Sequence, residues 1–247
     1  EAVADDCKEF LVYYQPVVDI TSGESICCGA EALVRWDSHK LGFMPPDKFI
    51  PLAEYLGLII PIGEHVLLEA CRRCRHWNEF GHPEYRVNVN LSVLQLLQKD
   101  IINVIANAIK VTGINPDNLV LEVTEGMAIN DMDRMKEVLE KIHDLGVRLA
   151  LDDFGTGYSS LSHMKDLPFD ELKIDKCFVD DIDKDDYSDA FVRSVSQLAD
   201  AVNLNVVVEG VERDRQQDVL KGMDVDMIQG FLYDKPLPQD EFEKRWL

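Results

Sequence analysis

The chain has 247 residues, of which 46% are hydrophobic, and its formal net charge is −21. That charge excludes electrostatic binding to a nucleic-acid polymer, because such binding depends on clustered lysine and arginine. No apolar run approaches the length of a membrane span, so we expect no membrane contact within this segment. A small anionic ligand would have to be received by bound cations rather than by the bare protein surface.

Length and terminus indicate how the domain is organised. A single α/β barrel commonly occupies about 250 residues, so we expect one domain over residues 1–247. The chain begins at Glu1 without a methionine or a signal-peptide pattern, which indicates a piece cut from a longer protein.

The cysteines favour a reduced, cytoplasmic location, because the six of them form no convincing disulfide framework. This leaves open a membrane anchor in other domains of a full-length protein. Cys71 and Cys74 form a CxxC pair inside an arginine-rich helical pattern. No second pair accompanies them, which favours packing over zinc binding.

Hydrophobic periodicity predicts strands and helices in alternation. The predicted strands are residues 11–20, 28–36, 86–92, 119–125, 149–153, 171–176, 205–212 and 226–233. The predicted helices are two within residues 49–80, divided at Gly57 and Pro61, then 92–111 capped by Ser92, 133–145, 187–202, 213–221 and 239–246.

About eight strands that alternate with helices predict a parallel α/β barrel. The first two strands are joined only by a short turn around Gly23, which cannot hold a crossover helix. They should therefore pair antiparallel. We expect an α/β fold of the modified TIM-like (β/α)8 type, with its first strand antiparallel to the others.

The stretch LALDDFGTGYSSL at residues 149–161 ends a short apolar run in two adjacent carboxylates, Asp152 and Asp153. Neighbouring carboxylates repel each other and resist desolvation, so this placement favours a shared cation. Gly155 and Gly157 allow a tight loop to follow. Taken alone, an Asx turn that caps the next helix explains the pattern equally well.

Polar groups recur at the ends of the predicted strands, and in a barrel these ends converge on one mouth. They are Glu31, Asn90, Glu122, Asp152, Asp153, Lys173, Glu209 and Gln229. Any single one could be a satisfied buried polar group or a solvated loop carboxylate. Together they favour a common site, because charged side chains are mostly kept out of barrel strands.

Oxygen ligands without histidine or thiolate select Mg²⁺, Mn²⁺ or Ca²⁺ over zinc, and none of the six histidines falls at a strand end. The acids exceed what one divalent ion needs, so we expect two ions roughly 3.5–4 Å apart. Such a pair stabilises in-line displacement at phosphorus. Lys173 would lie near the attacking water as a proton acceptor or a charge stabiliser.

These motifs together resemble the EAL domain family over residues 14–238. They are EAL at 31–33, VNLS at 89–92, LEVTE at 121–125, DDFGTGYSSL at 152–161, LKID at 172–175, EGVE at 209–212 and QG at 229–230. The resemblance implies hydrolysis of cyclic di-GMP to linear pGpG with two Mg²⁺ or Mn²⁺ ions. That reaction would lower the second-messenger level in bacterial signalling.

The resemblance also implies a role for each matching residue. The implied metal ligands are Glu31, Asn90, Glu122, Asp152, Asp153 and Glu209. The implied catalytic residues are Lys173, positioned at the catalytic water, with Glu209 and Glu31. The implied nucleotide contacts are Gln15, Leu33, Arg35 on a phosphate, and Gln229. The implied supporting residues are Asp175, Glu212 and Glu125, the last ordering the loop after residues 121–124 at the usual dimer interface.

The resemblance further implies a homodimer and attached regulatory or sensory domains. The alternative is a catalytically silent receptor for cyclic di-GMP, but such members usually lack ligand positions and here none departs from the pattern. A scaffold that only dimerises would leave a buried acidic cluster unneutralised. Ca²⁺ is expected to inhibit, because its longer and looser coordination misplaces the attacking water.

Overall fold

The structure is a computed structural model of the chain, and it describes residues 2–3, 7–125, 132–156 and 166–247. The strands are β1 (Phe10–Asp19), β2 (Ile26–Ser38), β3 (Gly42–Met44), β4 (Arg86–Asn90), β5 (Leu119–Thr124), β6 (Arg148–Phe154), β7 (Glu171–Ile174), β8 (Asn205–Val208), β9 (Met227–Gln229) and β10 (Leu237–Pro238). The helices are α1 (Pro46–Tyr55), α2 (Ile59–Glu79), α3 (Val93–Leu96), α4 (Ile101–Thr112), α6 (Met132–His143), α8 (Asp186–Ala201), α9 (Asp214–Leu220) and α10 (Gln239–Trp246), with 3₁₀ turns η1 (Pro116–Asn118) and η2 (Lys176–Phe178).

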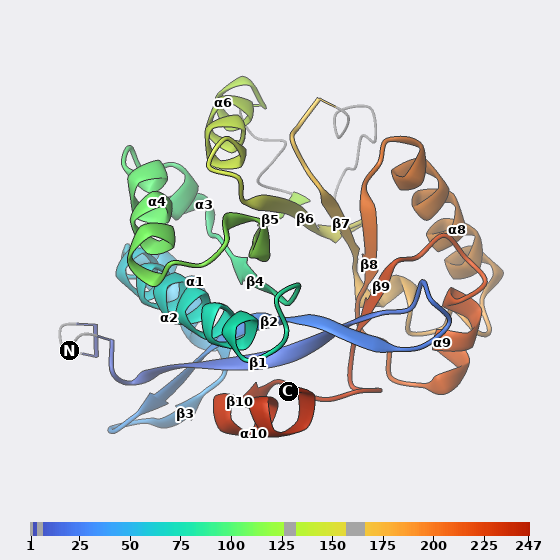
Figure 1. Ribbon diagram of the computed structural model, residues 1–247, viewed down its shortest axis with the longest axis horizontal. Helices are drawn as coiled ribbons and strands as arrows, with labels where there is room; N and C mark the ends of the chain where they lie inside the picture. The colour runs from blue at the N-terminus through green and yellow to red at the C-terminus, as the bar shows by residue number, and fades with distance from the viewer. Residues whose placement is uncertain (1, 4–6, 126–131, 157–165) are drawn as a thin grey trace.

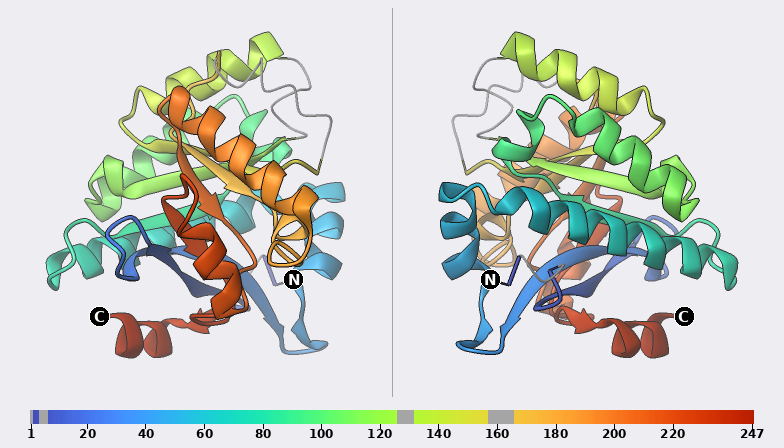
Figure 2. Two further views of the ribbon diagram at one scale, coloured as in Figure 1. Left: turned by 90° about the vertical axis from the view of Figure 1, so that its right-hand side faces the viewer. Right: turned by 90° about the vertical axis from the view of Figure 1, so that its left-hand side faces the viewer.

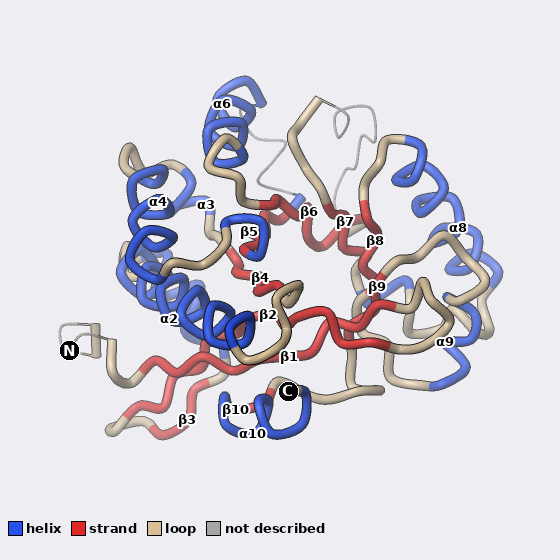
Figure 3. The backbone as a smooth tube through the Cα atoms, in the orientation of Figure 1, coloured by secondary structure: helices blue, strands red, loops and turns tan. Residues whose placement is uncertain are grey.

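Eight strands close into a barrel, seen as a ring in Figure 3. Their order around the ring is β1-β9-β8-β7-β6-β5-β4-β2, and pairing of β1 with β2 completes it. Strand β1 runs antiparallel to both neighbours, and the other barrel pairings are parallel. The predicted modified TIM-like barrel is confirmed, including the reversed first strand.

Helices cover the outside of the barrel (Figure 1; Figure 2). The buried ring of Trp77 on α2 lies 5.1 Å from that of Tyr14 on β1 and 5.0 Å from that of Phe242 on α10, centroid to centroid. These aromatic contacts pack α2 and α10 against the reversed strand.

Cys71 and Cys74 on α2 form no disulfide and are fully buried, as the packing interpretation predicts. Among the described residues, no helix is both long enough and apolar enough to cross a membrane.

Two helix predictions need correction. The single helix predicted over 92–111 is wrong, because a turn divides it into α3 and α4. Leu96 and Ile101 are both buried, but five residues apart they would lie about 140° apart on one continuous helix. Pro61 does not separate α1 from α2. It lies in the first turn of α2, where its missing N–H would have no helical partner.

Strands β3 and β10 were not predicted. They contain three and two residues, too few for an alternating pattern to be recognised.

The close pairing of β2 with β4 depends on the glycine at position 29. A side chain at Gly29 would place its Cβ only 2.2 Å from the carbonyl oxygen of Arg86, so glycine lets β2 approach β4.

A buried ion pair lies at the amino-terminal end of the parallel strands. The guanidinium Nη1 of Arg86, at the start of β4, lies 3.2 Å from Oε1 of Glu171, at the start of β7. The Glu171 side chain is only 3% exposed, whereas that of Arg86 is 29% exposed. Burial raises the pKa of Glu171, and Arg86 opposes that rise.

We expect Arg86→Met to lower the free energy of unfolding at pH 8 by about 2 kcal/mol. The value is below the usual cost for a fully buried pair because Arg86 is partly exposed. The folded-state pKa of Glu171 exceeds its unfolded value, so protonation favours the folded state and the loss should shrink toward pH 5. Urea denaturation at both pH values measures this difference.

The matched control is Arg75→Met. Arg75 forms a pair with Glu79 in which both side chains are exposed, and such pairs contribute at most about 1 kcal/mol. A loss for Arg86→Met that equals the control, or that does not change between pH 8 and pH 5, would contradict the role given to Glu171.

Candidate active site

The structure brings the predicted strand-end residues together at one mouth of the barrel. Glu31 lies on β2, Asn90 on β4, Glu122 on β5, the two aspartates on β6, Lys173 on β7 and Gln229 on β9, while Glu209 follows β8 directly. In a parallel barrel this edge is formed by the carboxyl ends of the strands, which explains why residues so distant in sequence meet.

Lys173 lies at the centre of the acidic group and is 1% exposed. Its Nζ is 2.7 Å from Oε1 of Glu209 and 2.8 Å from Oε2 of Glu122. It also lies 3.3 Å from Oδ1 of Asp152 and 3.8 Å from Oε2 of Glu31. One ammonium therefore contacts carboxylates that come from four different parts of the barrel.

Burial and charge act in opposite directions on these groups. Burial by itself lowers the pKa of Lys173, but the four carboxylates together raise that pKa well above its ordinary value. Burial raises the pKa of Glu122, and it raises the pKa of Glu209 to about 7, with Lys173 opposing both shifts. The side chain of Lys173 is thus held as an ammonium at neutral pH by its surroundings.

The two aspartates of β6 lie at a β-bulge. Leu151 pairs with Leu172 and Phe154 pairs with Ile174, so β6 contains one more residue than β7 across this interval. Asp153 has φ of 57°, a left-handed conformation uncommon outside glycine, and its amide donates to Oδ1 of Asp152. The bulge lets adjacent side chains face the same site instead of opposite faces of the strand.

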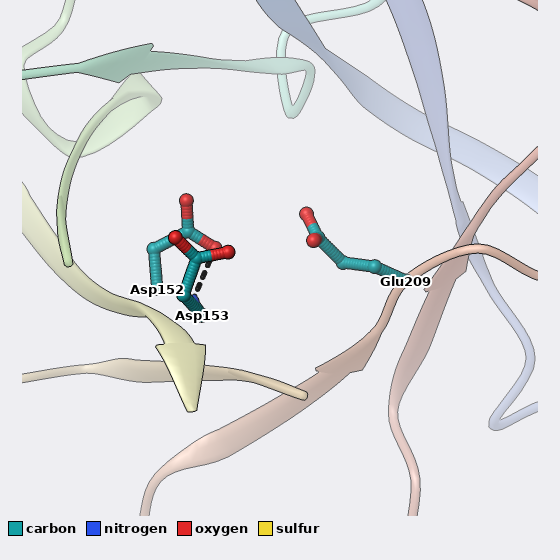
Figure 4. Close-up of side chains that lie close together, drawn as sticks. All are labelled: Asp152, Asp153 and Glu209. Carbon is teal, nitrogen blue, oxygen red and sulfur yellow. Dashed lines mark hydrogen bonds between the residues drawn. The ribbon is translucent and has the colours of Figure 1, made fainter. Parts of the chain in front are cut away.

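Figure 4 shows the result of that bulge, with the carboxylates of Asp152 and Asp153 facing that of Glu209. One oxygen from each of these side chains lies within 4.8 Å of the others, close enough for all three to hold one cation. Burial raises the pKa of Asp153, and the neighbouring carboxylates of Asp152 and Asp175 raise it further. Excess negative charge at this point favours a bound cation.

The donor chemistry of the site fits divalent cations. Five carboxylates lie around or beside the ammonium of Lys173, and the described histidines lie outside this group. The carboxylates are those of Glu31, Glu122, Asp152, Asp153 and Glu209. Carboxylate and amide oxygens are the ligands that Mg²⁺ and Mn²⁺ prefer. An excess of buried negative charge is costly without cations or protons to balance it.

A chain of side-chain amides supports Glu31. Asn90 Nδ2 donates to Glu31 Oε1 at 2.6 Å, and Gln229 Nε2 donates to Glu31 Oε2 at 2.6 Å. Gln229 also donates to Oε1 of Gln15, whose own amide donates to the carbonyl of Asp234. The Oε1 atom of Gln229 is buried and accepts no hydrogen bond from the described residues, so it can accept one from a ligand or water.

Arg35 and Leu33 lie beside this acidic group. The guanidinium of Arg35 lies 5.5 Å from the centre of the Tyr13 ring and makes no ion pair with any described residue. Burial lowers its pKa, and the nearby Glu31 opposes that change. Leu33 lines a cavity of about 260 Å³ shared with the acidic site, as well as a second cavity that Arg35 also lines.

The predicted supporting residues occupy the rim. Asp175 and Glu212 line the same cavity as Glu31, and the carboxylate of Asp175 caps η2. Glu125 is buried, and its Oε2 accepts the backbone N–H of Gly155 at 3.1 Å, which ties the end of β5 to the segment after β6. The loop at 126–131 that Glu125 was expected to order lies outside the described residues, as does the DDFGTGYSSL motif from residue 157 onward.

Asn88 also belongs to the site, although it is not among the residues that the sequence predicts for it. This residue is 5% exposed, and its amide Nδ2 donates to Oε1 of Glu122 at 2.8 Å. The alternation of valine and asparagine over residues 86–90 places Asn88 and Asn90 on the same face of β4. That pattern was a signal that both amides face the barrel interior.

Fold and site together define a modified α/β barrel with an acidic, cation-compatible site at the carboxyl ends of its strands. A profile of the EAL domain matches residues 1–236, and the chain belongs to the EAL domain family.

Two relatives align with nearly the whole length of this chain. The bifunctional diguanylate cyclase/cyclic di-GMP phosphodiesterase MucR of Pseudomonas aeruginosa is 41% identical over 234 residues, 95% of this chain and 34% of that protein. The cyclic di-GMP phosphodiesterase PdeR of Escherichia coli is 37% identical over 238 residues, 96% of this chain and 35% of that protein. The chain thus spans about a third of the length of these relatives.

A solved structure described as the PaMucR phosphodiesterase in complex with c-di-GMP superposes with a TM-score of 0.90. It is 39% identical and the match covers 98% of this chain and all of that chain. The cGMP-bound form of the EAL enzyme Bd1971 superposes with a TM-score of 0.91 at 30% identity, over 99% of this chain and 67% of that one. Both likenesses extend over the whole barrel.

We expect Lys173→Met to lower the Tm in EDTA at pH 8, because it removes the one ammonium from the acidic group. Breaking such a buried pair costs about 3–5 kcal/mol. The pKa values of Glu122 and Glu209 are raised in the folded state, so acid favours that state and the loss should shrink toward pH 5. Thermal unfolding at both pH values measures the effect.

Divalent cation should stabilise this variant more than the wild type, because its carboxylates have lost their internal counter-charge. Added Mn²⁺ is expected to raise the Tm of Lys173→Met by more degrees than that of wild type. The control is Lys184→Met, whose exposed side chain pairs with Asp181 at the surface. An unchanged Tm in EDTA for Lys173→Met would show that Lys173 does not balance the carboxylates.

Proposed function

We propose that this domain hydrolyses cyclic di-GMP to linear pGpG with the aid of two divalent cations, Mg²⁺ or Mn²⁺. The observation that carries the proposal is the group of four carboxylates around Lys173 at the mouth of the barrel, with that of Asp153 beside them. The names of MucR and PdeR as cyclic di-GMP phosphodiesterases support it, as does the PaMucR complex with c-di-GMP.

The cations would be held by oxygen atoms of Glu31, Asn90, Glu122, Asp152, Asp153 and Glu209. When bound, two divalent ions lower the pKa of water and stabilise the attacking and leaving oxygens of an in-line displacement. The protein positions these ligands rigidly, because five of the six lie on barrel strands and Glu209 follows one directly.

Lys173 acts on the charge that develops at the phosphoryl group. Its ammonium is buried, fixed by contacts to Glu122 and Glu209, and raised in pKa by its neighbours, which suits electrostatic stabilisation. Its second proposed role, as proton acceptor for the attacking water, requires that bound cations oppose the carboxylates. Glu209 and Glu31 complete the catalytic set, and Glu209 is the alternative proton acceptor.

The nucleotide would be held on the side of the mouth formed by β1 and β2. Arg35 offers a guanidinium free of internal ion pairs among the described residues, which fits bidentate binding of a phosphate. Gln15 and Gln229 offer amides beside the catalytic carboxylates, and the unused Oε1 of Gln229 can accept an N–H or O–H donor. Leu33 supplies apolar contact.

The wider setting is part of the same proposal. We infer one domain over residues 1–247 acting within a longer cytoplasmic signalling protein with regulatory or sensory domains. Homodimerisation through the region after β5 is proposed as well. The contact between Glu125 and the backbone of Gly155 supports a link between that region and the acidic site.

The first test is the pair of measurements that separates chemistry from binding. We expect Lys173→Ala to lower the single-turnover rate in Mg²⁺ by roughly two to four orders of magnitude, the usual range for a positioned acid–base or electrostatic group. Affinity for cyclic di-GMP measured in Ca²⁺ should change far less, because Arg35, Gln15 and Leu33 remain in place.

Two results would revise this assignment. If binding falls in proportion to rate, Lys173 holds the phosphate and Glu209 is the better candidate for activating water. If the wild type binds cyclic di-GMP but shows no turnover in Mg²⁺ or Mn²⁺ above the EDTA control, the domain is a receptor rather than a hydrolase.

Calcium should separate binding from cleavage in the wild type. Ca²⁺ accepts more ligands at longer distances than Mg²⁺, so the carboxylates can hold it while the attacking water is misplaced. We expect cyclic di-GMP to bind in Ca²⁺ without turnover, and added Ca²⁺ to inhibit the Mg²⁺ reaction. Turnover in Ca²⁺ alone that matches turnover in Mg²⁺ would contradict the two-ion geometry.

A further inference from the structure

We propose that Asn88 is a positioning residue, which orients the carboxylate of Glu122 toward the cation site. The proposal rests on the proposed function, because it concerns how this chain holds one of the proposed metal ligands. Asn88 lies on β4 one layer below Asn90, on the same face of the strand, and is 5% exposed. It has no part in the strand-end pattern.

The geometry shows what Asn88 does. Its Nδ2 donates to Oε1 of Glu122 at 2.8 Å, while Nζ of Lys173 donates to Oε2 of Glu122 at 2.8 Å. Both oxygens of Glu122 are thus engaged from different directions, so rotation of the carboxylate breaks at least one bond. A carboxylate offers about four lone-pair positions, so each oxygen keeps capacity for a cation.

The chemistry of an amide suits this position. Glu122 has no exposed side-chain surface, so its oxygens depend on partners inside the barrel. A neutral amide donor at Oε1 supplies one hydrogen bond without adding a charge that would repel a cation. A second lysine would compete with the cation for the same oxygen, and an aspartate would add another negative charge to a group that already has an excess.

Strand β4 donates a side-chain hydrogen bond to a glutamate on each of its two neighbouring strands. Asn90 donates to Glu31 on β2, and Asn88 donates to Glu122 on β5. In register, Asn90 lies beside Glu122, and Asn88 lies beside Glu31, so each amide reaches across diagonally. The two asparagines therefore set the orientation of glutamates on opposite sides of one strand.

The test measures the dissociation constant of Mn²⁺ alone by titration calorimetry, without nucleotide. Hydrogen-bond partners of metal ligands typically contribute about 10–100-fold in metal affinity. We expect Asn88→Ala to weaken Mn²⁺ binding by a factor in that range. Asn88→Leu, which keeps the branched skeleton of four heavy side-chain atoms but has no donor, should weaken it equally and serves if the alanine variant does not fold.

The matched control is Asn118→Ala. Asn118 is also 5% exposed, but it donates to Asn78 and to the carbonyl of Pro83, away from the acidic group. We expect this variant to lose thermal stability while its Mn²⁺ affinity stays that of wild type. If Asn118→Ala weakens Mn²⁺ binding as much as Asn88→Ala does, the effect of Asn88 is one of general packing, and the proposal is overturned.

Failure of this inference is distinct from failure of the proposed function. If wild type and both Asn88 variants bind Mn²⁺ with the same affinity, Asn88 does not position Glu122, and the metal-dependent hydrolase stands. If wild type itself does not bind Mn²⁺, the proposed function fails first, and the positioning role fails with it.

Discussion

The burial of Lys173 among carboxylates is the constraint on which the site depends. Attraction between opposite charges is strong in a protein interior, but each buried charge also loses its hydration, so the arrangement is stable only with close geometry. Four carboxylates from β2, β5, β6 and the end of β8 lie within 4 Å of one nitrogen. The barrel must close correctly for these contacts to exist.

The two ends of the barrel balance charge differently. At the amino-terminal end, Glu171 faces Arg86 in a one-to-one pair. At the mouth, the ammonium of Lys173 contacts four carboxylates, and Asp153 adds a fifth beside them. In barrels of this kind, residues at the amino-terminal ends of the strands usually support stability, and residues at the carboxyl ends support function. The distribution of charge in this chain follows that division.

Much of the fold could be predicted because it depends on local pattern. The short turn around Gly23 required the first two strands to pair antiparallel, and the polar strand ends were bound to meet once a barrel was inferred. The bulge at Asp153 could not be predicted, because it depends on how β6 pairs with β7. Asn88 was missed for a related reason: alternation gives the face of a side chain but not its hydrogen-bond partner.

The length of β2 has a consequence for what the domain can accept. This strand has 13 residues, whereas β7 has four, so β2 continues beyond the residues that pair with β4 while it stays paired with β1 as far as Trp36. Glu31, Leu33 and Arg35 alternate onto one face of it, and a strand rises about 3.3 Å per residue. The backbone positions of the carboxylate and the guanidinium are thus about 13 Å apart. The spacing along β2 therefore favours a ligand long enough to reach from Glu31 to Arg35.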